Sequence, residues 1–293
     1  MFDSAFYSRL GRLKLAVDKK SNASLLGSRK STRKGSSAEF SDFREYIPGD
    51  DIRSIDWNAY ARLDRLYIKE YMEEKESSIS FFLDLSPSMD YGEPTKTELA
   101  EELTAGLAYI ALMNLDHVTV YDLADTARRH VAGGGARGYR ELTAWLEKLG
   151  GNGGCADLTK GVRSIQRMQP GLSIVVSDFL SEEFVEDTEA LEKAIRYLQY
   201  RRQKVVLLQV MAGEELNIDL TGTYFLIDAE DESSRVHVTM DSESVGKYDR
   251  ELKGFLNRIQ QCAKKCGASW HLCSTADGFE RIIFNELRDI YEY

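Results

Sequence analysis

Four oxygen-bearing side chains follow two apolar runs of the sequence. Asp84, Ser86 and Ser88 alternate in DLSPS, directly after ISFFL, and Asp178 ends a second run, LSIVVSD. A carboxylate and two hydroxyls that turn toward one point as a strand ends make an all-oxygen set suited to Mg²⁺. So few protein charges leave such an ion partly uncompensated, and it can then accept a carboxylate from a partner. The alternative is that Asp84 and the serines only cap the helix that follows.

Alternating strands and helices must position these residues. From residue 78 onward, short apolar runs typical of buried strands alternate with segments of helical periodicity. This pattern predicts an α/β fold with a doubly wound, mostly parallel sheet and helices on both faces. Ligands bind beyond the carboxyl ends of the strands in such sheets, so we expect Asp84 and Asp178 to converge at one rim. The expected strands are residues 79–85, 117–123, 172–177, 204–210 and 269–273, and the expected helices are residues 96–115, 139–149, 157–168, 187–200, 243–266 and 277–291.

The first 77 residues are expected to form a basic arm and a charged, aromatic annex, and residues 78–293 the sheet domain with an insertion near 213–242. Residues 1–38 carry nine Lys or Arg and two acids, a balance of +7. An apolar stripe predicts an amphipathic helix there, for which docking on the acidic body of the chain is favoured over a membrane. In the annex, alternating Asp and Arg residues predict a frame of ion pairs. The stripe consists of Phe2, Phe6, Leu10, Leu13 and Val17.

Composition argues against several classes of protein. The chain has 293 residues and a formal charge of −10, so nucleic acid is not expected as a partner. No stretch approaches the roughly 18 apolar residues of a membrane span. Four cysteines in so long a chain suit a reducing compartment, which predicts a cytoplasmic protein.

Rival motifs are weaker than the oxygen set. Gly133, Gly135 and Gly138 satisfy GxGxxG, but a short polar stretch precedes them where a dinucleotide site needs a strand. Ser86 and Ser88 lie in no GxSxG turn, which disfavours serine hydrolysis. Cys262 and Cys266 could ligate zinc, yet both continue an apolar helical stripe and are interpreted as buried thiols.

A known bacterial family shares the segment GSRKSTRKGSSAEFSDFREYIPGDDIRSIDWNAYARLDRLYIKEY, followed by SISFFLDLSPSM. It is the domain-of-unknown-function family fifty-eight, which this chain resembles over nearly its whole length. Members carry a von Willebrand factor A-like fold and are often encoded beside MoxR-type AAA+ ATPases. The resemblance implies that Asp84, Ser86 and Ser88 form the first loop of a metal-ion-dependent adhesion site. It also implies that Asp178 is the acid of the last loop.

The second loop departs from the family's pattern. Where the family commonly shows a Thr before Asp-Leu, this chain has Ala156 before Asp157 and Leu158. A ligand hydroxyl is therefore missing, which weakens the expected Mg²⁺ site, and Thr159 or a water is the available substitute. Asp157 completes the set of candidate metal ligands.

Together these features predict a non-enzymatic protein–protein interaction module with a metal-ion-dependent adhesion-like site. By resemblance, its partners are a MoxR-type AAA+ ATPase and client proteins that the pair assembles or activates. One alternative is a Mg²⁺-dependent hydrolase using Asp84 and Asp178, with Asp157 as the only nearby candidate for a general base. Another is a scaffold whose metal site is vestigial.

Overall fold

The structure, a computed structural model, describes residues 4–17, 38–73, 77–149, 157–181, 184, 187–218, 222–227 and 235–292. The chain divides into two compact units. Unit 1 comprises Met1–Ser21 with Ser77–Tyr293, and unit 2 comprises Asn22–Glu76. Of the helices within the described ranges, none is both long and apolar enough to cross a bilayer.

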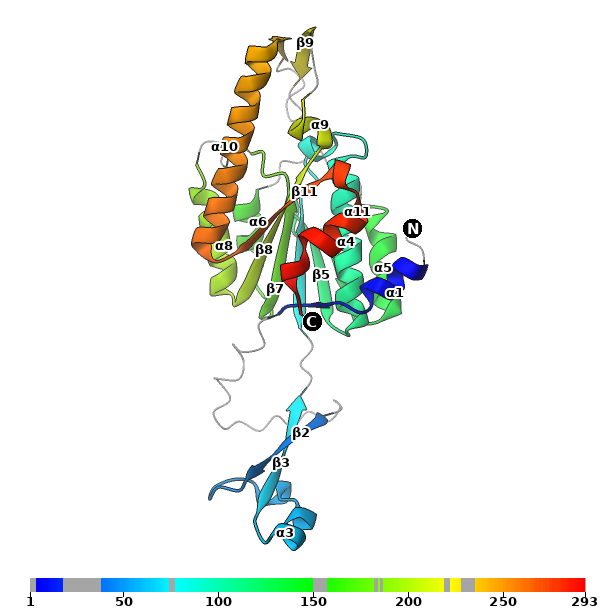
Figure 1. The fold of residues 1–293 in the computed structure, drawn as a ribbon, viewed down its shortest axis with the longest axis vertical. Helices are drawn as coiled ribbons and strands as arrows, with labels where there is room; N and C mark the ends of the chain where they lie inside the picture. Colours follow the sequence, from blue (N-terminus) through cyan, green and yellow to red (C-terminus); the bar gives the residue numbers. More distant parts are fainter. Residues whose placement is uncertain are drawn as a thin grey trace. The chain divides into compact units, whose positions relative to one another are not determined.

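A six-stranded sheet forms the centre of unit 1, in the order β11-β8-β7-β4-β5-β6 (Figure 1). Five strands are parallel, and only β6 at the edge runs antiparallel to its neighbour β5. The predicted α/β, doubly wound fold is confirmed. The strand order reverses between β4 and β7, and crevices at such switch points are where open α/β sheets bind ligands. The strands are β4 (Ser78–Leu83), β5 (His117–Asp122), β6 (Arg129–Ala132), β7 (Gly171–Ser177), β8 (Gln203–Met211) and β11 (Ser269–Ser274).

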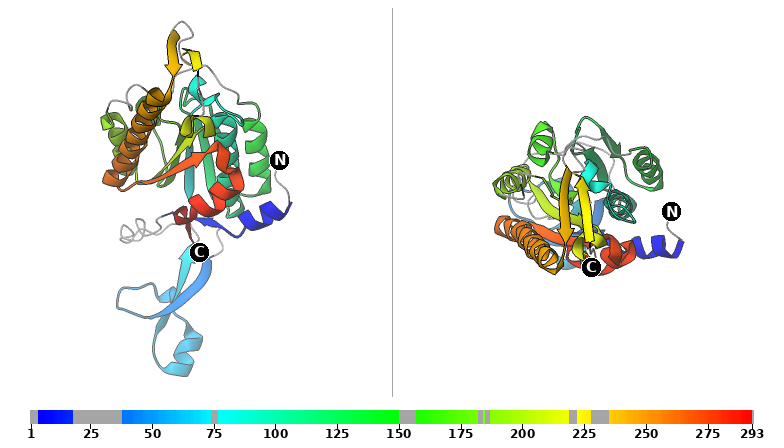
Figure 2. Two further views of the ribbon diagram at one scale, coloured as in Figure 1. Left: turned by 45° about the horizontal axis from the view of Figure 1, so that its top comes forward. Right: turned by 90° about the horizontal axis from the view of Figure 1, so that it is seen from above.

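Helices cover both faces of this sheet (Figures 1 and 2). Successive side chains of a strand point to opposite faces, so Phe81 of β4 enters one apolar core and Phe82 the other. The first core is closed by α4 (Lys96–Met113) and α5 (Ala136–Leu146). The second core is closed by α6 (Leu158–Ser164), α8 (Glu189–Tyr200) and α10 (Ser242–Cys266).

The N-terminal segment is part of unit 1, unlike the expected division at residue 77. Helix α1 (Ser4–Leu10) is shorter than the apolar stripe suggests, because the chain then becomes extended and β1 (Lys14–Leu15) pairs with β12 (Tyr291–Glu292). Phe6, Leu10, Leu15 and Val17 are all buried in the first core. The described part of the basic arm thus docks on the chain's own body, as favoured from the sequence, and residues 18–37 lie outside the described ranges.

The same pairing explains the C-terminus, where a single helix was expected over residues 277–291. Only Phe279–Arg281 is α-helical (α11). A π-helical turn at Ile282–Glu286 and a 3₁₀ turn at Arg288–Ile290 follow, and they bring the chain into the extended strand β12.

Between β8 and α10 lies the segment expected as an insertion. It holds the four-residue helix α9 (Gly213–Leu216) and an antiparallel hairpin of β9 (Gly222–Ile227) and β10 (Arg235–Met240). The hairpin is a two-stranded sheet of its own and does not pair with the central sheet.

Unit 2 is built on the antiparallel hairpin of β2 (Ala38–Glu45) and β3 (Tyr67–Glu73), with α3 (Trp57–Leu63) between them. Asp56 caps α3 by accepting hydrogen bonds from the N–H groups of Asn58 and Ala59. Ion pairs link Arg44 to Asp50 at 3.0 Å and Arg65 to Glu45 at 3.1 Å. The acidic and basic residues of this unit therefore brace its turns, as the alternating charges predict.

Replacing Phe6 by Ala tests whether α1 belongs to the core of unit 1. Phe6 is buried against Phe279 and Phe284, with ring centroids 5.2 and 5.6 Å away. We expect the free energy of unfolding in urea to fall by about 3–5 kcal/mol, because the substitution leaves a cavity. The control is Tyr200→Ala, at a side chain that is 81% exposed, with an expected change within about 0.5 kcal/mol. An equally small change for Phe6→Ala would contradict the assignment.

Candidate functional site

Two predicted site residues that are far apart in sequence meet at the switch point of the sheet. Asp84 follows β4 and Asp178 follows β7, which are paired neighbours, and the N–H of Asp84 donates to the carbonyl of Val176 at 2.9 Å. Both carboxylates line one pocket together with Ser86 and Ser88. The open volume of the pocket is about 20 Å³, which is room for about one water or a small ion. The remaining lining residues are Leu123, Leu158, Val175, Ser177, Phe179, Leu180, Ser181 and Phe184.

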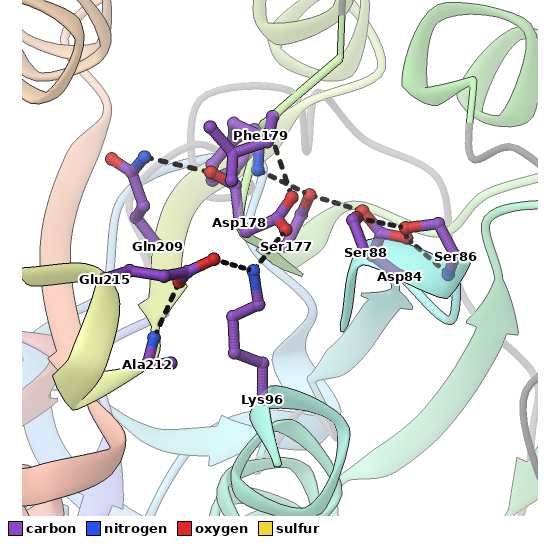
Figure 3. A network of polar contacts seen from close by, with 11 residues as sticks. Asp84, Ser86, Ser88, Lys96, Ser177, Asp178, Phe179, Gln209, Ala212 and Glu215 are labelled. Atoms are coloured by element: carbon purple, nitrogen blue, oxygen red, sulfur yellow. Dashed lines mark hydrogen bonds and ion pairs between the residues drawn. The ribbon is translucent and has the colours of Figure 1, made fainter. Parts of the chain in front are cut away.

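Asp84 is the centre of a buried hydrogen-bond network (Figure 3). Its Oδ1 accepts hydrogen bonds from the N–H of Ser86 at 2.9 Å and from the Ser86 hydroxyl at 2.7 Å. Its Oδ2 accepts the Ser177 hydroxyl at 2.5 Å. Burial raises the pKa of Asp84, as does the charge of Asp178, and the bonds from Ser177 and Ser86 offset part of this rise. A cation beside Asp84 would favour its charged form.

The capping alternative does not describe these residues. Thr95 caps α4, in a capping box with Glu98. The turn that directly follows Asp84 is the short 3₁₀ helix Pro87–Met89, and the Ser86 side chain makes no capping bond to it. The hydroxyls of Ser86 and Ser88 lie 3.1 Å apart instead. Adjacent ligands of an octahedral Mg²⁺ at 2.0–2.1 Å are about 3 Å apart, so this spacing suits two ligands of one ion.

The triplet Ser177–Phe179 turns the end of β7 toward Asp84. The Ser177 oxygen accepts the N–H of Phe179 at 2.9 Å while its hydroxyl donates to Asp84. Phe179 has a φ of 58°, the left-handed region that aromatic side chains rarely adopt. Asp178 is fixed at its backbone too, because its carbonyl accepts the side-chain amide of Gln209 at 3.0 Å. The indole N–H of Trp270 holds Gln209 in turn, at 3.0 Å.

A buried lysine that sequence reasoning missed completes this region. Lys96 is the first residue of α4 and its side chain is 1% exposed. Its ammonium donates to Asp178 Oδ2 and to Glu215 Oε1, both at 2.8 Å (Figure 3). Burial acts to lower the pKa of Lys96, but Asp178 and Glu215 outweigh it and the net shift is upward. The one signal in the sequence is a cation at a helix N-terminus, which the helix dipole disfavours and which therefore needs anions beside it.

Asp157 and Thr159 do not reach the pocket. Asp157 caps α6, where its Oδ1 accepts the N–H of Lys160 at 2.7 Å and its Oδ2 pairs with the Lys160 ammonium at 2.7 Å. The Thr159 hydroxyl donates to the carbonyl of Ala190 at 3.3 Å. Neither residue is among the described residues that line the pocket, and Ala156 lies outside the described ranges. Asp157 is a predicted ligand, and its capping role is the physical reason that it does not line the pocket.

Ser181 offers an oxygen that the sequence did not suggest. Its hydroxyl is buried, lines the pocket, and has no hydrogen-bond partner among the residues that the structure describes. Buried polar groups are normally paired, so a group that the pocket admits would satisfy this hydroxyl.

The pocket residues fit one divalent cation. Asp84, Asp178 and Glu215 carry three negative charges against the one positive charge of Lys96, which leaves a formal charge of −2. Both Asp178 oxygens already have donors, Lys96 and the N–H of Leu180 at 2.9 Å. Both Asp84 oxygens have donors too, but these are neutral groups of Ser86 and Ser177, so among the described residues the charge of Asp84 has no cation beside it. Asp84, Ser86 and Ser88 would therefore hold the ion, with water completing its shell. The ligands offered are oxygens, which suit a hard cation, and within the described ranges there is no cluster of three or more His, Cys, Asp or Glu side chains suited to a metal.

The rival motifs have structural roles. Adding a Cβ to Gly138 would bring it within 1.9 Å of the Gly133 carbonyl oxygen, and the N–H of Gly135 donates to Leu112 at the C-terminal end of α4. These glycines thus allow close packing of α5 beside α4, at the opposite end of α4 from Lys96. Cys262 and Cys266 are buried in the second core.

Residues 42–253 match the family model described as "Protein of unknown function DUF58". The chain belongs to the DUF58 family. Relatives of this DUF58 chain include the uncharacterized proteins Rv1480 of Mycobacterium tuberculosis (strain H37Rv) and Mb1516 of Mycobacterium bovis. Each is 22% identical over 280 residues, which are 91% of this chain and 84% of the relative.

Two solved structures are similar at low sequence identity. The pilus adhesin SpaC from Lactobacillus rhamnosus GG, in its open conformation, is 12% identical with a TM-score of 0.42, covering 75% of this chain and 30% of SpaC. The manganese-loaded TRAP protein of Plasmodium vivax is 12% identical with a TM-score of 0.31, covering 45% of this chain and 56% of TRAP. The DUF58 chain thus spans little more than half of one structure and less than a third of the other.

Replacing Lys96 by Met tests the buried ion pairs. The change leaves Asp178, which is 2% exposed, without its cation. We expect the free energy of unfolding to fall by about 3–5 kcal/mol in urea titrations. The control is Lys193→Met, which removes a solvent-exposed pair with Glu189 and should cost less than about 1 kcal/mol. Equal effects of the two substitutions would contradict the importance of the buried pairs.

Proposed function

We propose that this DUF58 chain is a non-enzymatic protein-binding module that takes a carboxylate of a partner protein at a Mg²⁺ held by Asp84, Ser86 and Ser88. The convergence of these three residues and Asp178 on one small pocket carries the proposal. When bound, the ion supplies a positive charge that compensates Asp84 and keeps a position for an outside oxygen. The chain's own residues orient the hydroxyls, keep Asp178 paired with Lys96, and exclude bulk water.

The pocket favours binding over catalysis. Its open volume of about 20 Å³ has room for about one water or ion. This volume is far below the roughly 300–1,000 Å³ of typical small-molecule sites. Its described lining contains no His, Cys, Lys or Glu, and its two acids are hydrogen-bonded. Asp157, the only candidate base for a hydrolase, caps α6 and pairs with Lys160. The hydrolase alternative therefore has no positioned base.

The geometry of the site favours a functional metal site over a vestigial one. A vestigial site has no need for the Ser86 and Ser88 oxygens to lie 3.1 Å apart, or for a Ser181 hydroxyl in the same pocket that lacks a partner among the described residues. The partner that the family resemblance suggests is a MoxR-type AAA+ ATPase, with the pair acting in the assembly or activation of client proteins.

Binding of a MoxR-type ATPase from the same genome tests this proposal. Isothermal titration calorimetry would compare the wild-type chain and Ser88→Ala, each in Mg²⁺ and in EDTA. The Ser88 hydroxyl lies against that of Ser86, and the hydrogen bonds to Asp84 come from Ser86 and Ser177, so its loss leaves the Asp84 network intact. We expect Kd to rise about tenfold or more for Ser88→Ala and in EDTA, because an ion ligand is lost.

The matched control is Ser8→Ala, at an exposed serine of α1, which should bind like the wild type. A Kd that neither EDTA nor Ser88→Ala changes would refute the metal-assisted mechanism.

A further inference from the structure

Lys96 holds two carboxylates that differ in their access to solvent. The Asp178 side chain is 2% exposed and the Glu215 side chain is 16% exposed, while the lysine itself is 1% exposed. Asp178 is also anchored on both sides, by Leu180 at its carboxylate and by Gln209 at its carbonyl. Glu215, the more solvent-accessible of the two carboxylates, is therefore the partner that can be exchanged.

Local contacts of α9 place Glu215 at Lys96. The Glu215 Oε2 accepts the N–H of Ala212 at 2.8 Å, and its carbonyl accepts the Tyr248 hydroxyl at 3.1 Å. The N–H of Gly213 donates to the Thr275 hydroxyl at 3.0 Å. Helix α9 has only four residues and none of them is fully buried, although Leu216 packs against the second core. A helix this short and partly exposed can leave without unpairing any strand of the sheet.

We infer that Lys96 is a carboxylate-binding position which Glu215 fills in the free protein and which an acidic side chain of a partner takes on binding. The inference rests on the proposed function, since it names Glu215 as the internal competitor of the partner's carboxylate. Exchange of one carboxylate for another keeps the buried ammonium paired, which avoids the cost of an isolated buried charge.

Charge balance supports competition rather than joint occupancy. With one divalent cation in the pocket, the charges of Asp84, Asp178, Glu215, Lys96 and the ion sum to zero. A further carboxylate from a partner would leave a surplus negative charge in a buried site. Departure of Glu215 restores neutrality, and it frees α9 at the start of the segment that carries the β9–β10 hairpin.

Acetate, a carboxylate the size of the Glu215 head group, tests the position directly. Glu215→Ala vacates it, so sodium acetate should raise the Tm of this variant saturably by about 2 °C or more over sodium chloride at equal ionic strength. The matched control is Glu214→Ala, at an exposed residue of the same helix, which should respond to acetate no more than the wild type does. If Glu215→Ala does not fold, Glu215→Ser replaces it, since serine also vacates the position and is polar enough for a partly exposed site. An equal response of the Glu215 and Glu214 variants to acetate would overturn the inference.

A second measurement separates this inference from the proposed function. Glu215→Gln keeps the shape of the side chain and removes its charge, so it should bind the MoxR-type ATPase several-fold more tightly than the wild type in Mg²⁺. Acetate rescue without any binding of the ATPase would overturn the proposed partner and support the carboxylate position. Unchanged or weaker binding by Glu215→Gln, where the wild type binds, would overturn the competition.

Discussion

A buried ammonium group between two carboxylates governs the carboxyl end of this sheet. Lys96, Asp178 and Glu215 bring three charges into a region with little solvent, and each is tolerable only because the others are within hydrogen-bond distance. The pairing also decides which pocket residues can bind a ligand. The charge of Asp178 is already compensated by Lys96, so Asp84 and the hydroxyl groups are the lining residues left to bind an ion. A hard divalent cation with a mostly aqueous shell is the ligand that this chemistry favours.

The parallel sheet makes this arrangement possible. Strands β4 and β7 are neighbours although Asp84 and Asp178 are far apart in sequence, and both strands end at the same edge. Helix α4 starts at that edge and delivers Lys96, while the chain leaves β8 there and delivers Glu215 through α9. Four segments thus supply the four charged groups. Asp84 and Asp178 follow strands, Lys96 begins α4, and Glu215 lies in α9. The rigidity of the sheet fixes Asp84 and Asp178, whereas Glu215 depends on a four-residue helix.

The convergence of Asp84, Ser86, Ser88 and Asp178 could be predicted from the sequence, because strand–helix alternation dictates a parallel sheet and its strand ends share one rim. The role of Lys96 could not, since a lysine in the first turn of a helix is usually solvated and its position at the N-terminus does not say which anions lie beside it. Glu215 is held by tertiary contacts of a short helix, which has no periodicity to read. Asp157, a predicted ligand, is instead a helix cap outside the pocket lining, and the sequence did not show this for a related reason. Its spacing to Lys160 is equally that of a helix cap, and the cap is what forms.

At the N-terminus, too, the local sequence pattern does not predict the structure that tertiary pairing imposes. An apolar stripe continues from Phe6 to Val17, but the helix ends at Leu10 because pairing of β1 with β12 demands an extended chain. The stripe correctly predicted burial of Phe6, Leu10 and Val17, but Leu13 is only partly buried and Leu15, outside the stripe, is buried in its place. Tertiary pairing, absent from any local window, decided the rest.

Anomalous diffraction from crystals of the wild-type chain soaked in Mn²⁺ tests the central claim most directly, because Mn²⁺ takes the same oxygen ligands as Mg²⁺. The account predicts a peak within bonding distance of the Ser86 and Ser88 hydroxyls and beside Asp84, with Lys96 still paired to Asp178. A saturating soak that leaves this pocket without a peak, or a peak bonded instead to Asp157, would contradict it.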